Sequence, residues 1–520
     1  MKQYSKIKFL AVAVAAASLA ACGGGSSSSS GGTTGGGSTA VTANLSANPS
    51  FVFDQTDYVG AVDPAATSNW FGFAMTGSFP TTAAAVDTST ATTSNFEPNV
   101  TYTPDVSAIT PATDCPSISG SAVVTPNGTE TIGGKTFQKC QLSGTILTDL
   151  TLTNDVVWSL VNRVNVGNGN NTQTTTSTPA SVTLTINAGT VFASESGSSL
   201  VVTRGSEINA VGTEAQPIVM AGDLSNGLGN TGEWGGLVLQ GYAYHNKCGD
   251  PATETVCNID GEGAAGKFGG FNNADSSGTL QYVIVTEAGS ILSNGDELNG
   301  IGFMGVGYGT TVDHIQVHGN ADDGVEFFGG AVDIKNIILT ANQDDSIDWD
   351  EGYVGNIQYA FILQTQNQND AVSKNHAFEL DTAGDARESA YQESNPTVAN
   401  VTAIASLDAT EATVRGDGIH LKEGSEGQFV NILLVGDYED CIFLQDNTVE
   451  TSYADINDAF VNVYASCGGN TIDAGTSGYT VTSVMASTSY EALDDKMATT
   501  AITLTSVPTI ASKEIDGSAN

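Results

Sequence analysis

The sequence is poor in positive charge. Its 520 residues contain 16 Lys and Arg against 57 Asp and Glu, which gives a net charge of −41. Such a chain stays soluble but repels polyanions, which argues against nucleic acid, an anionic membrane surface or an unaided acidic polysaccharide as its partner. Cations are the natural counterpart of this charge. The alternative is that the acidity is a general property of a salt-adapted proteome.

Helical periodicity and long apolar runs are also scarce. The N-terminal apolar stretch, residues 9–21, is too short for a bilayer, which needs roughly 20 apolar residues. It follows the cationic residues Lys2, Lys6 and Lys8, so we interpret it as the apolar region of a cleaved export signal. In the rest of the chain, short β-branched runs broken by Gly, Asn and Asp favour strands.

Cysteine is infrequent, with seven residues in all. No CxxC pair exists and the five His are not spaced as ligands, so the sequence predicts no metal site built on Cys and His. Without Cys22 an even number remains, which in an exported protein favours disulfides. Other pairings are possible, but proximity in the sequence predicts Cys115–Cys140, Cys248–Cys257 and Cys441–Cys467.

The export signal ends in Leu19-Ala20-Ala21-Cys22, which resembles the lipobox of bacterial lipoproteins. The resemblance implies that residues 1–21 are removed as a signal peptide and that lipid is attached to Cys22, which anchors the chain to a membrane. Gly23 follows in place of Asp, and by the sorting rule of that family this favours the outer membrane, on its periplasmic or cell-surface side. Residues 22–44 are nearly all Gly, Ser, Thr and Ala and should form a flexible tether.

A repeat runs through the chain from residue 312 onward. His314–Val317 recurs 22 positions later as Asn336–Leu339, and Asn320–Phe327 recurs at the same offset as Asn342–Trp349. Such a period fits one coil of a parallel β-helix, in which each coil stacks on the last. The short strand after the acidic turn returns three more times. Its inward positions are apolar in every copy: Val325/Phe327, Ile347/Trp349, Phe378/Leu380, Ile419/Leu421 and Ile442/Leu444.

Earlier segments carry more specific motifs. Leu184–Val191, Val202–Thr213 and Pro217–Val219 resemble the opening coils of pectin-lyase-like β-helix proteins of bacterial surfaces. Gly232–Leu239 and Gly324–Gly330 resemble a largely uncharacterised group among them, found as lipoproteins and secreted proteins of marine proteobacteria and Bacteroidetes. The resemblance implies an all-β fold, a right-handed parallel β-helix, and no assigned reaction.

The expected organisation follows from these motifs. Residues 151–470 should form the β-helix. Residues 45–150, rich in Thr and Ala, should be a cap or insertion that covers the first coil, because the ends of a solenoid need capping. Residues 471–520 should form a C-terminal cap or tail.

The outward positions of the repeated strand carry carboxylates. Adjacent coils lie about 4.8 Å apart, and like charges at that distance repel by roughly 3 kcal/mol. Bound Ca²⁺, the neighbouring Lys422 and His420, or a raised carboxylate pKa could relieve the repulsion. The sequence therefore predicts a binding stripe in which all members but the first are also candidate metal ligands: Glu326, Asp348, Asp350, Glu379 and Asp381.

The turns before these strands contain two Asp pairs, Asp322-Asp323 and Asp344-Asp345. We interpret them as caps of the bends through side-chain-to-backbone hydrogen bonds. Polygalacturonases have a similar Asp pair, but their Gly-His-Gly and Arg-Ile-Lys motifs are missing from this sequence. The long excursion at residues 364–400 is expected to overhang the stripe.

Three functions fit this pattern. The first is a surface lipoprotein that presents a cation-dependent face to carbohydrate or a partner. The second is a Ca²⁺-dependent polysaccharide lyase, in which Arg415, His420 or Lys422 would abstract a proton; the alternative for Lys422 is an ion pair with Asp381. The third is an accessory lipoprotein of an outer-membrane uptake receptor. The scarcity of basic residues favours the first over the second.

Overall fold

The computed structural model describes residues 48, 51–54, 56, 58–61, 70–74, 105–224, 230–291, 298–364, 374–382, 393–405, 416–436, 438–445, 456–475 and 479–486. Within these ranges the chain is all-β apart from two single-turn 3-10 helices, Glu262–Ala264 and Ile456–Asp458. None of the described helices is long and apolar enough to cross a membrane. The predictions for Cys22, for the tether and for Arg415 lie outside the described residues.

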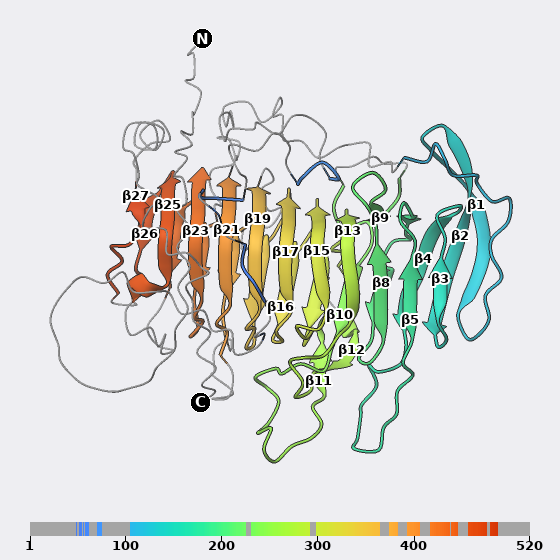
Figure 1. The fold of residues 1–520 in the computed structure, drawn as a ribbon, viewed down its shortest axis with the longest axis horizontal. Helices are drawn as coiled ribbons and strands as arrows, with labels where there is room; N and C mark the ends of the chain where they lie inside the picture. Colours follow the sequence, from blue (N-terminus) through green and yellow to red (C-terminus); the bar gives the residue numbers. More distant parts are fainter. Residues whose placement is uncertain are drawn as a thin grey trace, which may run out of the picture.

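The strands stack in parallel into a right-handed β-helix, as predicted, and stand side by side along one long axis (Figure 1). Short strands form one face of the solenoid, each paired in parallel with the next. This face consists of β7 (Ser199–Val202), β10 (Gly236–Gln240), β14 (Ile301–Met304), β16 (Val325–Phe328), β18 (Ile347–Asp350), β20 (Phe378–Leu380), β22 (Ile419–Leu421), β24 (Asp440–Leu444) and β26 (Asn470–Asp473).

Long strands form the other two faces, because each bends midway and continues on the next face. They are β13 (Gly278–Thr286), β15 (Thr311–His318), β17 (Asp333–Thr340), β19 (Asn356–Gln364), β21 (Thr397–Ala405), β23 (Gln428–Gly436) and β25 (Phe460–Cys467), and the two-residue β27 (Met485–Ala486) pairs with the second half of β25. In the first seven the bend is one left-handed residue with φ between 51° and 66°. Asn, which tolerates this conformation well, occupies four of these bends: Asn336, Asn400, Asn431 and Asn462.

In the first coils the two faces are still built from separate strands. These are β3 (Leu150–Leu152), β5 (Thr183–Ile186), β6 (Val191–Ala193), β8 (Glu207–Val211), β9 (Ile218–Ala221) and the first half of β4 (Val157–Val166), whose second half pairs with β7 on the short-strand face. The two halves of β13 pair with β8 and β9, which is where the separate strands merge into one bent strand.

The predicted repeat and its inward column are confirmed. Val325 pairs with Ile347 and Ile315 pairs with Ile337, which is the offset read from the sequence. All ten predicted inward side chains are at most 3% exposed. Burial of apolar side chains is the main favourable term in folding, so this column accounts for much of the stability of the solenoid.

The segment predicted as one cap serves two purposes. An antiparallel hairpin of β1 (Val123–Ile132) and β2 (Lys135–Ile146) lies at the start of the solenoid, and β2 continues in parallel onto β4. The described residues between 48 and 74 lie elsewhere, along the long strands: Asp54 N–H donates to Gln358 (2.8 Å) and Ala61 N–H to Thr402 Oγ1 (2.9 Å).

All three predicted disulfides are formed: Cys115–Cys140, Cys248–Cys257 and Cys441–Cys467. Cys441–Cys467 joins β24 to β25, and Cys115–Cys140 joins the segment before the N-terminal hairpin to β2. The third, Cys248–Cys257, closes a loop inside the long excursion between β10 and β13.

Candidate functional site

Stacking of the short strands produces the predicted acidic column. Glu326 pairs with Asp348, Asp348 with Glu379, and Glu379 with His420, on β16, β18, β20 and β22. The column is preceded by Gly302 and followed by Phe443. These four outward residues therefore stack in the order that the repeat in the sequence predicts.

Two oxygen clusters share Asp348. Donor atoms of Asp323, Glu326 and Asp348 lie within 4.8 Å of one another, and so do those of Asp345, Asp348 and Glu379. The Oδ1 atom of Asp348 is buried and has no hydrogen-bond partner. Burial first, and then the neighbouring carboxylates, raise the pKa of Asp348 and that of Glu326 well above their ordinary values. The clusters therefore favour a bound proton or a bound cation.

The second Asp of each turn belongs to a ladder that ties coil to coil. Asp323 Oδ1 accepts the backbone N–H of Asp345 (2.9 Å), Asp345 accepts that of His376, and Asp417 Oδ1 accepts that of Asp440 (3.0 Å). These are side-chain-to-backbone bonds of the expected kind, but they reach the next coil. Capping was the interpretation favoured from the sequence over a functional role, but donor atoms of Asp323 and Asp345 also belong to the oxygen clusters.

Asp350 and Asp381 form a separate pair, two residues further along their coils. Burial, and then the neighbouring carboxyl group of Asp381, raise the pKa of Asp350 well above its ordinary value. Burial raises the pKa of Asp381 to about 7. Of the four predicted metal ligands, Asp348 and Glu379 thus lie in a cluster of donor atoms, whereas Asp350 and Asp381 contact each other.

Lys422 lies in an ion pair, the alternative that the sequence analysis left open. Its Nζ is 3.1 Å from Glu379 Oε2 and 3.7 Å from Asp381 Oδ2. Burial disfavours the charged ammonium, but the attraction of these carboxylates outweighs it and raises the pKa of Lys422 above its ordinary value. A lysine held in the charged form is a poor general base.

His420 belongs to a hydrogen-bonded chain with His376. Asp417 N–H donates to His376 Nδ1 (2.8 Å), which leaves the proton of that ring on Nε2. His376 Nε2–H then donates to His420 Nδ1 (3.1 Å), and His420 Nε2–H donates to Gln445 Oε1 (2.6 Å). Both nitrogens of His420 are therefore engaged. Burial lowers the pKa of each imidazole, so both rings are neutral at neutral pH.

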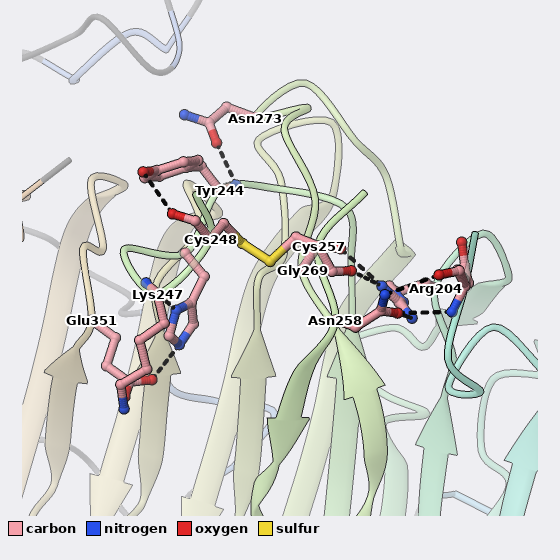
Figure 2. Close-up of a disulfide and its surroundings, with 11 residues drawn as sticks. Arg204, Tyr244, Lys247, Cys248, Cys257, Asn258, Gly269, Asn273 and Glu351 are labelled. Carbon is pink, nitrogen blue, oxygen red and sulfur yellow. Dashed lines mark hydrogen bonds and ion pairs between the residues drawn. A yellow bond between two sulfur atoms is a disulfide. The ribbon is translucent and has the colours of Figure 1, made fainter. Parts of the chain in front are cut away.

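An insertion at residues 241–277, between β10 and β13, borders the acidic column. It contains the hairpin of β11 (Ile259–Gly261) and β12 (Gly266–Phe268) and the Cys248–Cys257 disulfide (Figure 2). Phe268 packs in one apolar cluster with Met304 and Phe328, on the outward side of β14 and β16.

Polar contacts near both ends hold the insertion to the solenoid. At one end Glu351 binds both His245 and Lys247. At the other end the buried guanidinium of Arg204 donates to the carbonyl oxygens of Cys257 (2.7 Å) and Gly269 (3.0 Å) (Figure 2).

The sequence analysis did not identify residues 241–277 as the border of the column. It assigned this role to residues 364–400, of which 365–373 and 383–392 lie outside the described residues. The two cysteines nine positions apart were the available signal, since a short disulfide loop inside a β-helix indicates an inserted and stabilised excursion.

Comparison with known proteins agrees with this geometry. A family model described as a pectate-lyase-like β-helix domain matches residues 144–511. No curated protein and no solved structure matches the chain. The match covers most of the sequence, from the second strand of the N-terminal hairpin through the last described coil. The chain therefore belongs to the pectate-lyase-like β-helix family.

Proposed function

We propose that this protein is an outer-membrane lipoprotein whose β-helix binds Ca²⁺ at its acidic column and presents that face to carbohydrate or to a partner protein. The observation that carries the proposal is the position of Asp348. It belongs to both oxygen clusters, and its buried Oδ1 lacks a hydrogen-bond partner. Ca²⁺ takes six to eight oxygen ligands in flexible geometry, which suits an arrangement of stacked carboxylates with room for water or ligand oxygens.

The electrostatics of the column support a bound cation. The raised pKa values of Glu326 and Asp348 mean that ionisation of these groups is costly while the column holds no cation. A divalent cation would remove that cost by replacing protons with its own charge. It would also give an acidic polysaccharide a positive contact on a protein that otherwise repels it.

The lyase is the weaker alternative, because the described part of the site offers no obvious base. Lys422 is held as a cation by Glu379 and Asp381, and both nitrogens of His420 are already hydrogen-bonded. A general base needs a free lone pair within hydrogen-bond distance of the substrate proton. We therefore favour binding over elimination.

The decisive experiment is a Ca²⁺ titration of the chelator-treated protein, read by calorimetry and by thermal unfolding. Saturating Ca²⁺ at about 100 times its Kd should stabilise the fold by about 2.7 kcal/mol. Asp348→Asn should abolish the effect. Glu207→Gln, which removes an exposed carboxylate on β8, is the matched control and should keep it. Absence of any Ca²⁺ effect in the wild-type protein would refute the proposal.

Ligand class and anchoring need separate measurements. Uronic-acid polymers should bind in Ca²⁺ and dissociate in chelator, with no ultraviolet absorbance from unsaturated product; such absorbance would establish the lyase instead. Binding only to a solubilised outer-membrane receptor would favour the accessory role. Incorporation of labelled fatty acid into the wild-type chain, and none into Cys22→Ser, tests the lipid anchor.

A further inference from the structure

We propose that His376, His420 and Glu379 form a site for a divalent transition-metal ion of the Zn²⁺ class, next to the oxygen clusters and with only Glu379 in common with them. His376 Nε2 and His420 Nδ1 lie 3.1 Å apart, and Glu379 Oε1 lies 3.8 Å from the first and 3.9 Å from the second. Ligand atoms about 2.0–2.2 Å from one metal ion are about 3–3.5 Å from each other. Small side-chain shifts would therefore place all three atoms on one ion.

The three side chains come from rigid neighbouring coils. Glu379 on β20 and His420 on β22 are register partners, while His376 is positioned by its backbone N–H, which donates to Asp345 in the ladder. His376 and His420 are 3% and 8% exposed. Sites on regular elements hold their ligands more accurately than sites on loops, which applies to Glu379 and His420, while His376 lies just before β20 and is held by its hydrogen bonds to Asp345 and Asp417.

The second contacts of each ligand suit metal binding. Gln445 accepts the proton on His420 Nε2 (2.6 Å), so the lone pair of that ring lies on Nδ1 and faces the site. Lys422 holds Glu379 Oε2 at 3.1 Å and leaves Oε1 toward the histidines. Partners of this kind orient metal-binding side chains in many proteins.

Asp417 provides an independent indication. Its side chain is 1% exposed, and its Oδ2 has no hydrogen-bond partner although it lies 3.4 Å from His376 Nδ1 and 3.6 Å from His420 Nδ1. A buried carboxylate behind an imidazole is a common support for a metal-bound histidine. For a metal to bind at Nε2 the neutral ring must change tautomer: its single N–H proton leaves Nε2, one proton is taken up from solvent at Nδ1, and Asp417 Oδ2 is the acceptor for the new N–H. The cost is the hydrogen bond that Asp417 N–H now makes to Nδ1.

The donor set selects a different cation from that of the proposed function. Imidazole nitrogens suit Zn²⁺, Co²⁺ or Ni²⁺, whereas Ca²⁺ takes oxygen ligands. With two histidines and one carboxylate, positions remain open for water or a ligand. This inference does not rest on Ca²⁺ binding, because the two sites share only Glu379.

The test is titration of the chelator-treated protein with Co²⁺ in excess Ca²⁺, read by visible absorption, followed by displacement with Zn²⁺. One equivalent should bind with spectra of nitrogen and oxygen ligation. His376→Gln and His420→Gln should each weaken binding about 100-fold or more, and Asp417→Asn about 10- to 100-fold. Asp348→Asn should lose Ca²⁺ but keep Co²⁺, so the two proposals can fail separately.

His314→Gln is the matched control, because His314 lies at the bend of β15 on another face. Its affinity for Co²⁺ should equal that of the wild type. If a histidine variant does not fold, the hyperfine-shifted imidazole protons of Co²⁺-bound wild-type protein decide the question. Absence of saturable binding, absence of shifted imidazole protons, or undiminished binding in both folded histidine variants would overturn the inference.

Discussion

Neutralising Glu351 should release the insertion at residues 241–277 from the acidic face. Glu351 directly follows β18 and binds Lys247 of the insertion (Figure 2) as well as His245. Burial by itself would raise the pKa of Glu351. The hydrogen bond and charge of His245, followed by those of Lys247, outweigh burial and lower the pKa from 4.5 to about 2.

The size of the effect follows from this pKa. The difference between 4.5 and about 2 corresponds to about 3 kcal/mol, since a tenfold change in an equilibrium is about 1.4 kcal/mol. Because the pKa is lowered in the folded protein, the stabilisation is complete above the ordinary pKa of 4.5. It is lost as the pH falls toward 2. At pH 3 about a third to a half of it should remain.

Hydrogen exchange measured by mass spectrometry is the suitable assay. Asn246 N–H donates to the carbonyl oxygen of Glu351 (2.9 Å), and Lys247 N–H donates to His245 Nδ1 (3.0 Å). In Glu351→Gln these amides should exchange up to roughly 200-fold faster than in wild type at pH 7, and about tenfold faster at pH 3. Glu254→Gln, an exposed carboxylate of the same insertion, should change nothing. Equal protection at pH 7, or a difference that does not shrink at pH 3, would refute the reasoning.

Three further predictions concern stability. Lys422→Met leaves Glu379 and Asp381 without their cation. In chelator it should therefore lower the free energy of unfolding, measured in urea, by about 3 kcal/mol. Added Ca²⁺ should restore part of this lost free energy. Burial raises the pKa of Asp275 from 3.8 to about 6, so the penalty for its ionisation builds up as the pH rises between these values and is complete above about 6. Asp275→Asn should therefore stabilise by at most about 3 kcal/mol at pH 7.5 and leave unfolding at pH 4 or below nearly unchanged; equal effects at both pH values would contradict this. Trp349→Ala removes a fully buried indole that contacts Phe378 and Phe429. It should lower the free energy of unfolding by about 3–5 kcal/mol, measured by calorimetry. Phe443→Ala, on the outward side of β24, should lower it much less.

The coiled part of the fold could be predicted because its signal is local and repeated. Val325 and Phe327 alternate with outward residues, and the same alternation returns at Ile347 and Trp349. Strand alternation determines which side chains point inward, and a constant offset determines which residues become neighbours. The disulfides followed the same logic, since each joins cysteines that stacking or a short loop brings together.

The irregular parts could not be predicted in this way. His376 and His420 are 44 positions apart, which departs from the constant offset of the repeat, so no spacing in the sequence reveals that their nitrogens lie 3.1 Å apart. Likewise, nothing local indicates that the segment around Asp54 binds Gln358, 304 positions later. Such contacts depend on where a long connection returns to the solenoid.

By itself the sequence determined the β-helix, its inward column and the acidic outward column of Glu326, Asp348 and Glu379, because all three depend on strand alternation and a constant coil length. Only the tertiary structure decided how these charges are balanced. It placed Lys422 against Glu379, buried Asp350 and Asp381 so that their pKa values rise, and brought two histidines together beside them. The reason is physical: periodicity determines the face on which a side chain lies, but the partners of a charge depend on distances that only the stacked coils create.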